Sequence, residues 1–208
     1  MLAMIRNSYP YRLTSLVRGY VQWGERQFAG PSPHFIKQAC LVRNGFPNAT
    51  WVETGTFLGQ TTHFLSKHAA AVYSIEPEPT LFKNAVRYFR DFKNVTIING
   101  TSESEFPKLL AAINGDVNFW LDGHYSAGPT FKGRSDTPII EELSCISANL
   151  GRLGRACVLI DDLRCFDPTL LEFSSYPSID YLVNWARENN LKWHVEHDIF
   201  VARTPDVA

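Results

Sequence analysis

The chain has 208 residues, of which 45% are hydrophobic, and this is enough for one domain with a buried core. It has 20 Lys and Arg against 21 Asp and Glu, so no overall positive charge exists to hold a polyanion, and we expect no nucleic-acid partner. No stretch approaches the apolar run of about 20 residues that a membrane helix needs, and the amino terminus lacks the apolar core of a signal peptide. The four cysteines form no C-x-x-C pair, which favours a soluble, cytoplasmic protein with reduced thiols.

Residues 1–47 are predicted to form a helical extension in front of a core at 48–208, and the two parts together make a single domain. The first helix of the extension carries an apolar face made of Leu13, Leu16, Val17, Tyr20 and Val21. A second helix is expected to begin at Pro33 and to stop at Gly45. We expect these helices to pack beside the sheet or against a neighbouring subunit, and the second arrangement would give a homodimer.

Strand-like and helix-like segments alternate along the core, which is typical of an α/β fold. Five apolar strands are predicted, at 50–54, 71–76, 95–99, 117–122 and 156–161. Five helices are predicted, at 59–68, 79–91, 103–113, 136–150 and 178–190. The chain then ends in two alternating runs around His197 and Asp198, which indicate an antiparallel hairpin. We therefore expect a Rossmann-like, doubly wound, mixed sheet, mostly parallel with an antiparallel C-terminal hairpin strand and helices on both faces.

Acidic residues end four of these strands. They are Glu53, Glu76, Asp122, Asp161 and Asp162. In an open parallel sheet the carboxyl ends of the strands meet at one edge, and ligands bind outside that edge. The long loop from Gly123 to about Ser135 starts there as well, and long loops after sheet strands are often functional. The sequence therefore predicts a binding site at this edge.

The turn after the first strand contains two glycines, Gly55 and Gly59, which let the backbone approach a ligand closely. It lacks the Gly-Lys-Ser/Thr ending of a phosphate loop and the third glycine of a dinucleotide fingerprint. Glu76 lies about 20 residues farther on, where an acid commonly accepts hydrogen bonds from a ribose diol. With Glu53 nearby and no basic residue in the turn, the site suits a cationic or neutral nucleoside better than a pyrophosphate, and S-adenosylmethionine (SAM), a sulfonium, fits this description.

Two segments resemble motifs of the class I SAM-dependent methyltransferases. "VETGTFLGQTT" resembles their first motif, E-x-G-x-x-x-G, and "YSIEPEPTLFKNA" resembles the second, with Glu76 as the ribose-binding acid. The resemblance extends over about residues 50–203 and implies that the protein is a SAM-dependent methyltransferase. We expect the cofactor to contact Glu53, Gly55, Thr56, Gly59, Thr61, Glu76, Ser102 and Asp122.

The order of acids after the fourth and fifth strands is similar to that of the metal-dependent O-methyltransferases of the catechol and macrocin types. This resemblance implies that Asp122, Asp161 and Asp162 hold magnesium. Such an ion favours the ionised form of an acceptor hydroxyl. Asp122 is therefore expected in catalysis, with His124 as the leading candidate for the base. No lysine occupies the base position familiar from the catechol enzymes.

The stretch "WLDGHYSAGPTFKG" also resembles bacterial members of the family near polysaccharide and secondary-metabolite pathways, which implies a sugar or small hydroxylated acceptor. Amine or carbon acceptors stay open, as do two other classes of function. One is a nicotinamide-dependent oxidoreductase, and the other is a cofactor-binding protein without catalysis. Glu141 and Glu142 are expected to be solvated or to cap their helix, and the alternative is that one of them reaches the loop above Asp122.

Overall fold

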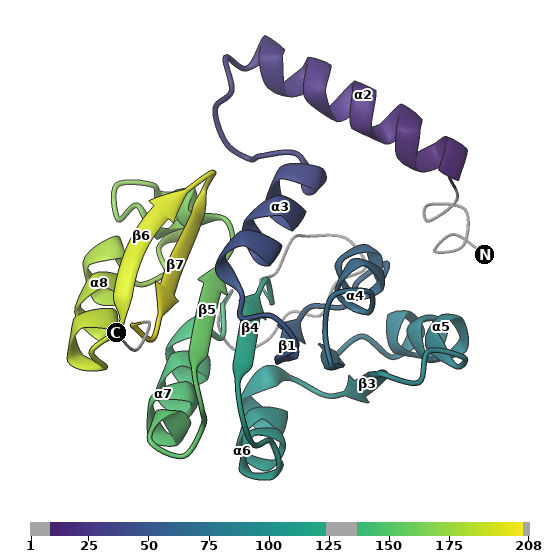
Figure 1. The fold of residues 1–208 in the computed structure, drawn as a ribbon. Coiled ribbons are helices and arrows are strands. Elements are labelled where there is room, and N and C mark those ends of the chain that lie inside the picture. The colour runs from purple at the N-terminus through teal and green to yellow at the C-terminus, as the bar shows by residue number, and fades with distance from the viewer. Residues whose placement is uncertain (1–8, 124–136, 206–208) are drawn as a thin grey trace.

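The computed structural model describes residues 9–123 and 137–205, with side chains from residue 14 onward. These residues form a seven-stranded sheet with strand order β3-β2-β1-β4-β5-β7-β6 (Figure 1). The strands are β1 (Thr50–Thr54), β2 (Ala71–Glu76), β3 (Val95–Asn99), β4 (Val117–Leu121), β5 (Ala156–Ile160), β6 (Lys192–Glu196) and β7 (Ile199–Arg203). The first five are parallel, and β7 pairs antiparallel with both β5 and β6. The predicted fold class is confirmed.

Strand composition explains the positions in the sheet. Every residue of β4 and of β5 is buried, as expected for continuous apolar strands covered on both faces. The edge strand β6 is mostly exposed and carries polar residues, which suits an edge that has no further strand beside it.

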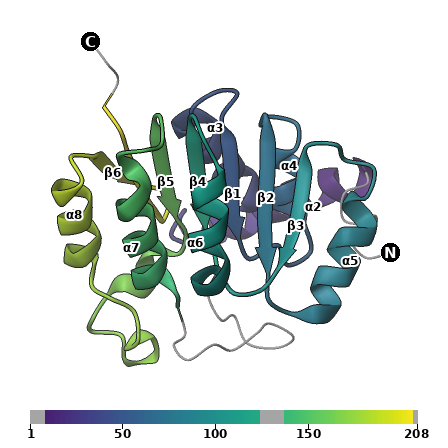
Figure 2. The ribbon, with the colours of Figure 1, turned by 90° about the horizontal axis from the view of Figure 1, so that it is seen from below.

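Helices cover both faces of the sheet. The α-helices are α2 (Tyr9–Glu25), α3 (His34–Asn44), α4 (Gln60–Leu65), α5 (Pro79–Phe89), α6 (Ser102–Ala112), α7 (Ile139–Leu150) and α8 (Ile179–Glu188), and two short 3-10 helices are η1 (Leu163–Phe166) and η2 (Leu171–Phe173). Figure 2 shows α6, α7 and α8 together on one face, where their apolar residues form the larger core cluster. Helices α3 and α4 supply apolar side chains to a second cluster that includes residues of β1, β5 and β7.

The two helices of the N-terminal extension pack differently. Cys40 and Leu41 of α3 are fully buried against the sheet. Helix α2 lies farther out than α3 (Figure 1). The part of its apolar face that is described remains 40–60% exposed, at Leu16, Val17, Tyr20 and Val21. Two arrangements are expected from the sequence, packing beside the sheet or against a neighbouring subunit. This face of α2 does not pack beside the sheet.

The turn between β6 and β7 brings the C-terminal hairpin to the acidic edge. His197 and Asp198 both have positive φ, 49° and 68°, as a tight two-residue hairpin turn requires. Leu163 donates its backbone N–H to the Asp198 carbonyl at 2.9 Å, and Arg164 donates its N–H to Asp198 Oδ1 at 2.9 Å.

Across residues 9–123 and 137–205, no helix has the length and apolar character needed to span a membrane.

Candidate functional site

The strand register brings the predicted acidic residues to one edge of the sheet. Thr54 is level with Ile75 on one side and with Leu121 on the other, and Leu121 is level with Ile160. Each acid lies within two residues of this line, because it is at or next to the end of its strand. The shared edge predicted from the sequence is therefore present.

The two glycines of the first turn are needed where the chain is tightly folded. Gly55 has φ of +85°, and a Cβ there would lie 2.8 Å from the backbone oxygen of Asp122. Gly59 has φ of +72°, and its Cβ would lie 2.8 Å from the ring of Phe89. Both positions combine a left-handed backbone with close contacts, so any larger residue would disturb the turn. Gly55 thus lets the turn after β1 approach the end of β4, where Asp122 begins the trio of aspartates.

Glu76 is fixed at the end of β2 by two backbone amides. Its Oε2 accepts the N–H of Phe57 at 2.7 Å, and its Oε1 accepts the N–H of Glu78 at 3.0 Å. Burial raises the pKa of Glu76, and these two hydrogen bonds oppose the rise. A carboxylate has about four acceptor sites, so Glu76 has acceptor capacity beyond its two amides. The predicted ribose contact of Glu76 stays a prediction.

Glu53 is the centre of a buried network behind the turn. Its Oε2 accepts hydrogen bonds from Thr62 Oγ1 and Ser74 Oγ, each at 2.5 Å, and Ser74 also pairs with Thr56 at 2.6 Å. Glu53, Thr56 and Thr62 are buried, whereas Thr61 is partly exposed. In this arrangement Glu53 holds the glycine turn against β2, and its predicted contact with the cofactor stays a prediction.

The buried Glu53 should make stability depend on pH. Burial raises its pKa from 4.5 to about 7, against the hydrogen bonds from Ser74 and Thr62. The folded state therefore binds this proton more tightly than the unfolded state, and the free energy of unfolding should fall as pH rises from about 4.5 to 7. We expect Glu53→Gln, which keeps an acceptor oxygen, to remove up to about 3 kcal/mol of this decline. Urea unfolding of wild type and Glu53→Gln at pH 5 and pH 7 measures this difference. An equal fall in the free energy of unfolding for both proteins would contradict the prediction.

A second buried carboxyl group, Glu142 of α7, lies on the other face of the sheet. Burial raises its pKa to about 7, and the nearby Ser102 and Thr54 side chains oppose the rise. The expectation that Glu142 is solvated or caps its helix is wrong. The sequence could have predicted its burial, because Glu142 lies three residues after Ile139 and four before Ile146, on the apolar face of the helix. The predicted cofactor contact of Ser102 stays a prediction.

Asp122, Asp161 and Asp162 converge as predicted. One carboxylate oxygen from each lies within 4.8 Å of the others. Asp161 Oδ1 accepts the backbone N–H of Asp162 at 2.8 Å, and Asp122 donates its own N–H to Thr54 Oγ1 at 3.3 Å. Asp162 has a left-handed backbone, with φ of 53°, which turns the chain from β5 into η1. Hard carboxylate oxygens at this separation suit magnesium, manganese or calcium.

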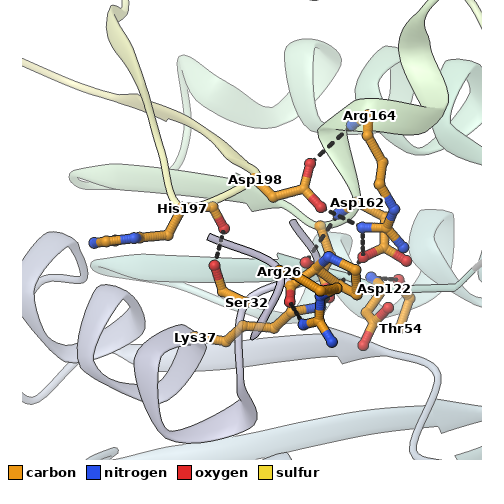
Figure 3. Close-up of polar contacts among 11 residues, drawn as sticks. Arg26, Ser32, Lys37, Thr54, Asp122, Asp162, Arg164, His197 and Asp198 are labelled. Carbon is orange, nitrogen blue, oxygen red and sulfur yellow. Dashed lines mark hydrogen bonds and ion pairs between the residues drawn. The ribbon is translucent and has the colours of Figure 1, made fainter. Parts of the chain in front are cut away.

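Two basic side chains contact the aspartates, and sequence reasoning missed both. Lys37 of α3 contacts Asp161 Oδ2 and lies 3.2 Å from Asp162 Oδ1. Arg164 lies 2.8 Å from Asp162 Oδ1 and also contacts Asp198. Figure 3 shows both cationic groups among the carboxylates, with Lys37 reaching in from α3. No motif marks Lys37, because its helix precedes the core and ordinary amphipathic spacing does not tell which polar side chain will meet β5.

Burial and charge act against each other in this cluster. Burial alone would lower the pKa of Lys37, but the carboxylates of Asp161, Asp162 and Asp122 raise it above its ordinary value. Burial and the charge of Asp161 raise the pKa of Asp122. Burial also raises the pKa of Asp161, and Lys37 partly offsets this effect. The neighbouring carboxylates therefore favour the ammonium form of Lys37.

The N-terminal extension is attached to the rest of the site around Lys37. Ser32 donates its hydroxyl to the carbonyl of His197 at 3.1 Å. Gly30 packs so closely that a Cβ would lie 2.9 Å from Asp198 Oδ2, and the ring of Trp23 meets that of His197 with centroids 6.0 Å apart. These contacts hold the segment that leads to Lys37 against the β6–β7 turn. The predicted base, His124, lies outside the described residues.

Several solved structures have a fold similar to that of this chain. No protein-family model and no curated protein matches the chain. Among solved structures, SMU.1697c from Streptococcus mutans, assigned as a methyltransferase and solved in complex with SAH, is 16% identical with a TM-score of 0.50, over 84% of this chain and 98% of that one. The N-methyltransferase NodS from Bradyrhizobium japonicum is 12% identical with a TM-score of 0.53, over 83% and 96%. Precorrin-6y C5,15-methyltransferase from Geobacter metallireducens is 12% identical with a TM-score of 0.51, over 85% and 90%.

These likenesses show that the chain has the fold of solved methyltransferases. The shared sheet places its ligand edge at the carboxyl ends of the parallel strands. That is the edge at which the glycine turn, Glu76 and the three aspartates lie.

Proposed function

We propose that the protein is a SAM-dependent methyltransferase. The observation that carries the proposal is Glu76, an anchored carboxylate at the end of β2, directly opposite the glycine turn that follows β1. Glu76 would accept hydrogen bonds from the ribose hydroxyls. The glycine turn carries no basic residue, and with the Glu76 carboxylate beside it the site favours a cationic ligand over a pyrophosphate. The methyltransferase fold supports the same assignment.

We further propose that the acceptor is a small hydroxylated metabolite or sugar, methylated on oxygen with help from a divalent ion. When bound, SAM supplies a methyl group on a sulfonium and the ion favours the ionised form of the acceptor hydroxyl. Asp122, Asp161 and Asp162 would hold the ion through one oxygen each. Asp122 lies next to the Gly55 turn and would also border the cofactor, so donor and acceptor would meet at the end of β4. Holding both reactants in line is the main contribution expected of the protein.

A direct test begins with cofactor binding. Calorimetric titration should give binding of S-adenosylhomocysteine (SAH) and none of NAD. A panel of sugars, catechols and amines with SAM, assayed for SAH release with magnesium or with chelator, then addresses the acceptor. Binding of NAD alone would overturn the proposal in favour of an oxidoreductase. SAH binding without turnover on any acceptor would favour a cofactor-binding protein without catalysis.

A homodimer through the N-terminal helices is the association that we propose, in a cytoplasmic setting that suits the four free cysteines. It is supported by the exposed apolar face of α2, which includes Val17 and Tyr20, because such faces often mark interaction surfaces. Light scattering should give twice the chain mass, and Val17→Asp combined with Tyr20→Asp should give a monomer with unchanged SAH affinity. A wild-type monomer at high concentration would contradict the dimer.

A further inference from the structure

We propose that Lys37 is the resident cation of the cluster formed by Asp122, Asp161 and Asp162, and that a divalent ion binds there only by displacing its ammonium group. The inference rests on the metal site of the proposed function. It adds that the N-terminal extension competes for that site.

The competition follows from the individual carboxylate oxygens. Both oxygens of Asp161 are engaged, Oδ1 by the backbone N–H of Asp162 and Oδ2 by the Lys37 ammonium. Asp162 Oδ1 is shared between Lys37 and Arg164. An ion that bridges the three aspartates would therefore bind Asp161 at an oxygen that already accepts a hydrogen bond, and at Oδ2 it would lie beside the Lys37 ammonium.

The low exposure of the cluster makes sharing unfavourable. Only 15% of the Lys37 side chain and 2% of the Asp161 side chain are exposed to solvent. A divalent ion on the same oxygen would lie within a few ångströms of the ammonium, and repulsion between two cations is poorly screened away from bulk water. Arg164 is a weaker competitor, because its guanidinium is also paired with Asp198.

Lys37 is held in position by the helix that carries it. Helix α3 buries Cys40 and Leu41 against the sheet, and the Ser32 hydroxyl ties the preceding segment to the β6–β7 turn. The ammonium is thus kept at a high effective concentration beside the carboxylates. By linkage, an ion that displaces Lys37 must also weaken the attachment of α3.

Manganese titration of the cofactor-free protein tests the proposal. Lys37→Met removes the charge and keeps an apolar stem, and we expect it to bind Mn²⁺ at least about tenfold more tightly than wild type, since a nearby positive charge is gone. Lys37→Arg keeps the charge and should stay close to wild type. Lys192→Met is the matched control. This exposed lysine of β6 is level in the sheet with Arg203, which is level with Cys157 near the start of β5, so it lies far from the carboxyl ends of the parallel strands. SAH binding by each variant shows that it is folded.

Equal manganese affinity in wild type and Lys37→Met, or binding by neither, would overturn the proposal. Hydrogen exchange gives an independent readout, since manganese should speed exchange in residues 33–44 of the wild type and leave that segment of Lys37→Met unchanged. Protection of this segment by manganese would also overturn it. Failure of the methyltransferase assignment is recognised separately, because it would appear as a loss of SAH binding in the wild type.

Discussion

Glu76→Ala is expected to weaken SAH binding by about 1.5–3 kcal/mol, which corresponds to a factor of roughly ten to one hundred and fifty in the dissociation constant. The range is that for hydrogen bonds to a charged group, and Glu76 would accept them from the ribose hydroxyls. The variant also removes the acceptor for the N–H groups of Phe57 and Glu78. The turn after β1 should therefore become less ordered, which adds to the loss.

Glu78→Ala is the matched control for this experiment. Its carboxylate lies two residues away but accepts the N–H of Leu81 at 2.6 Å and caps α5. Its removal should lower stability through the loss of this N-cap and leave SAH affinity within about threefold. Calorimetry on both variants separates the two effects. Equal affinity of Glu76→Ala and wild type would remove the ribose assignment.

Much of the fold can be predicted because burial selects the same residues that the sequence pattern marks. The runs at 50–54, 71–76 and 95–99 coincide with β1, β2 and β3. Most residues of β1 and β2 are buried, whereas the edge strand β3 is only partly covered. Helix ends are less well defined by the sequence. The helix expected at 59–68 is only Gln60–Leu65, because Gly59 adopts a left-handed conformation and the residues after Leu65 form turns.

The site could be predicted in part, and the reason is topological. Acids that end parallel strands must meet at one edge, so the convergence of Asp122 with Asp161 and Asp162 follows from strand order alone. Lys37 follows from no such rule. It reaches the cluster because α3 packs across β7, and that docking depends on the tertiary packing of an extension whose own sequence carries no site motif.

The pair between Lys37 and Asp161 should be among the stronger contributions to stability at this edge. Asp161→Asn leaves the Lys37 ammonium without its closest counter-charge, in a place where water reaches only 15% of that side chain. We expect a loss of about 3 kcal/mol in the free energy of unfolding, the lower end of the range for breaking a buried ion pair, because Lys37 retains some solvent contact and Asp162. Asp116→Asn, which breaks an exposed pair with Arg155, is the control and should lose about 1 kcal/mol or less.

A double-mutant cycle decides whether the loss comes from the unpaired ammonium or from altered packing. If the charge is the cause, adding Lys37→Met to Asp161→Asn should recover part of the stability, because no buried ammonium is left unpaired, and the coupling between the two substitutions should exceed about 1 kcal/mol. Urea unfolding of wild type, both single variants and the double variant gives this coupling. SAH affinity should stay unchanged throughout, since neither Lys37 nor Asp161 is among the proposed cofactor contacts. Additive losses from the two substitutions would mean that Lys37 and Asp161 contribute to folding independently, and the contact would then be incidental to the attachment of α3.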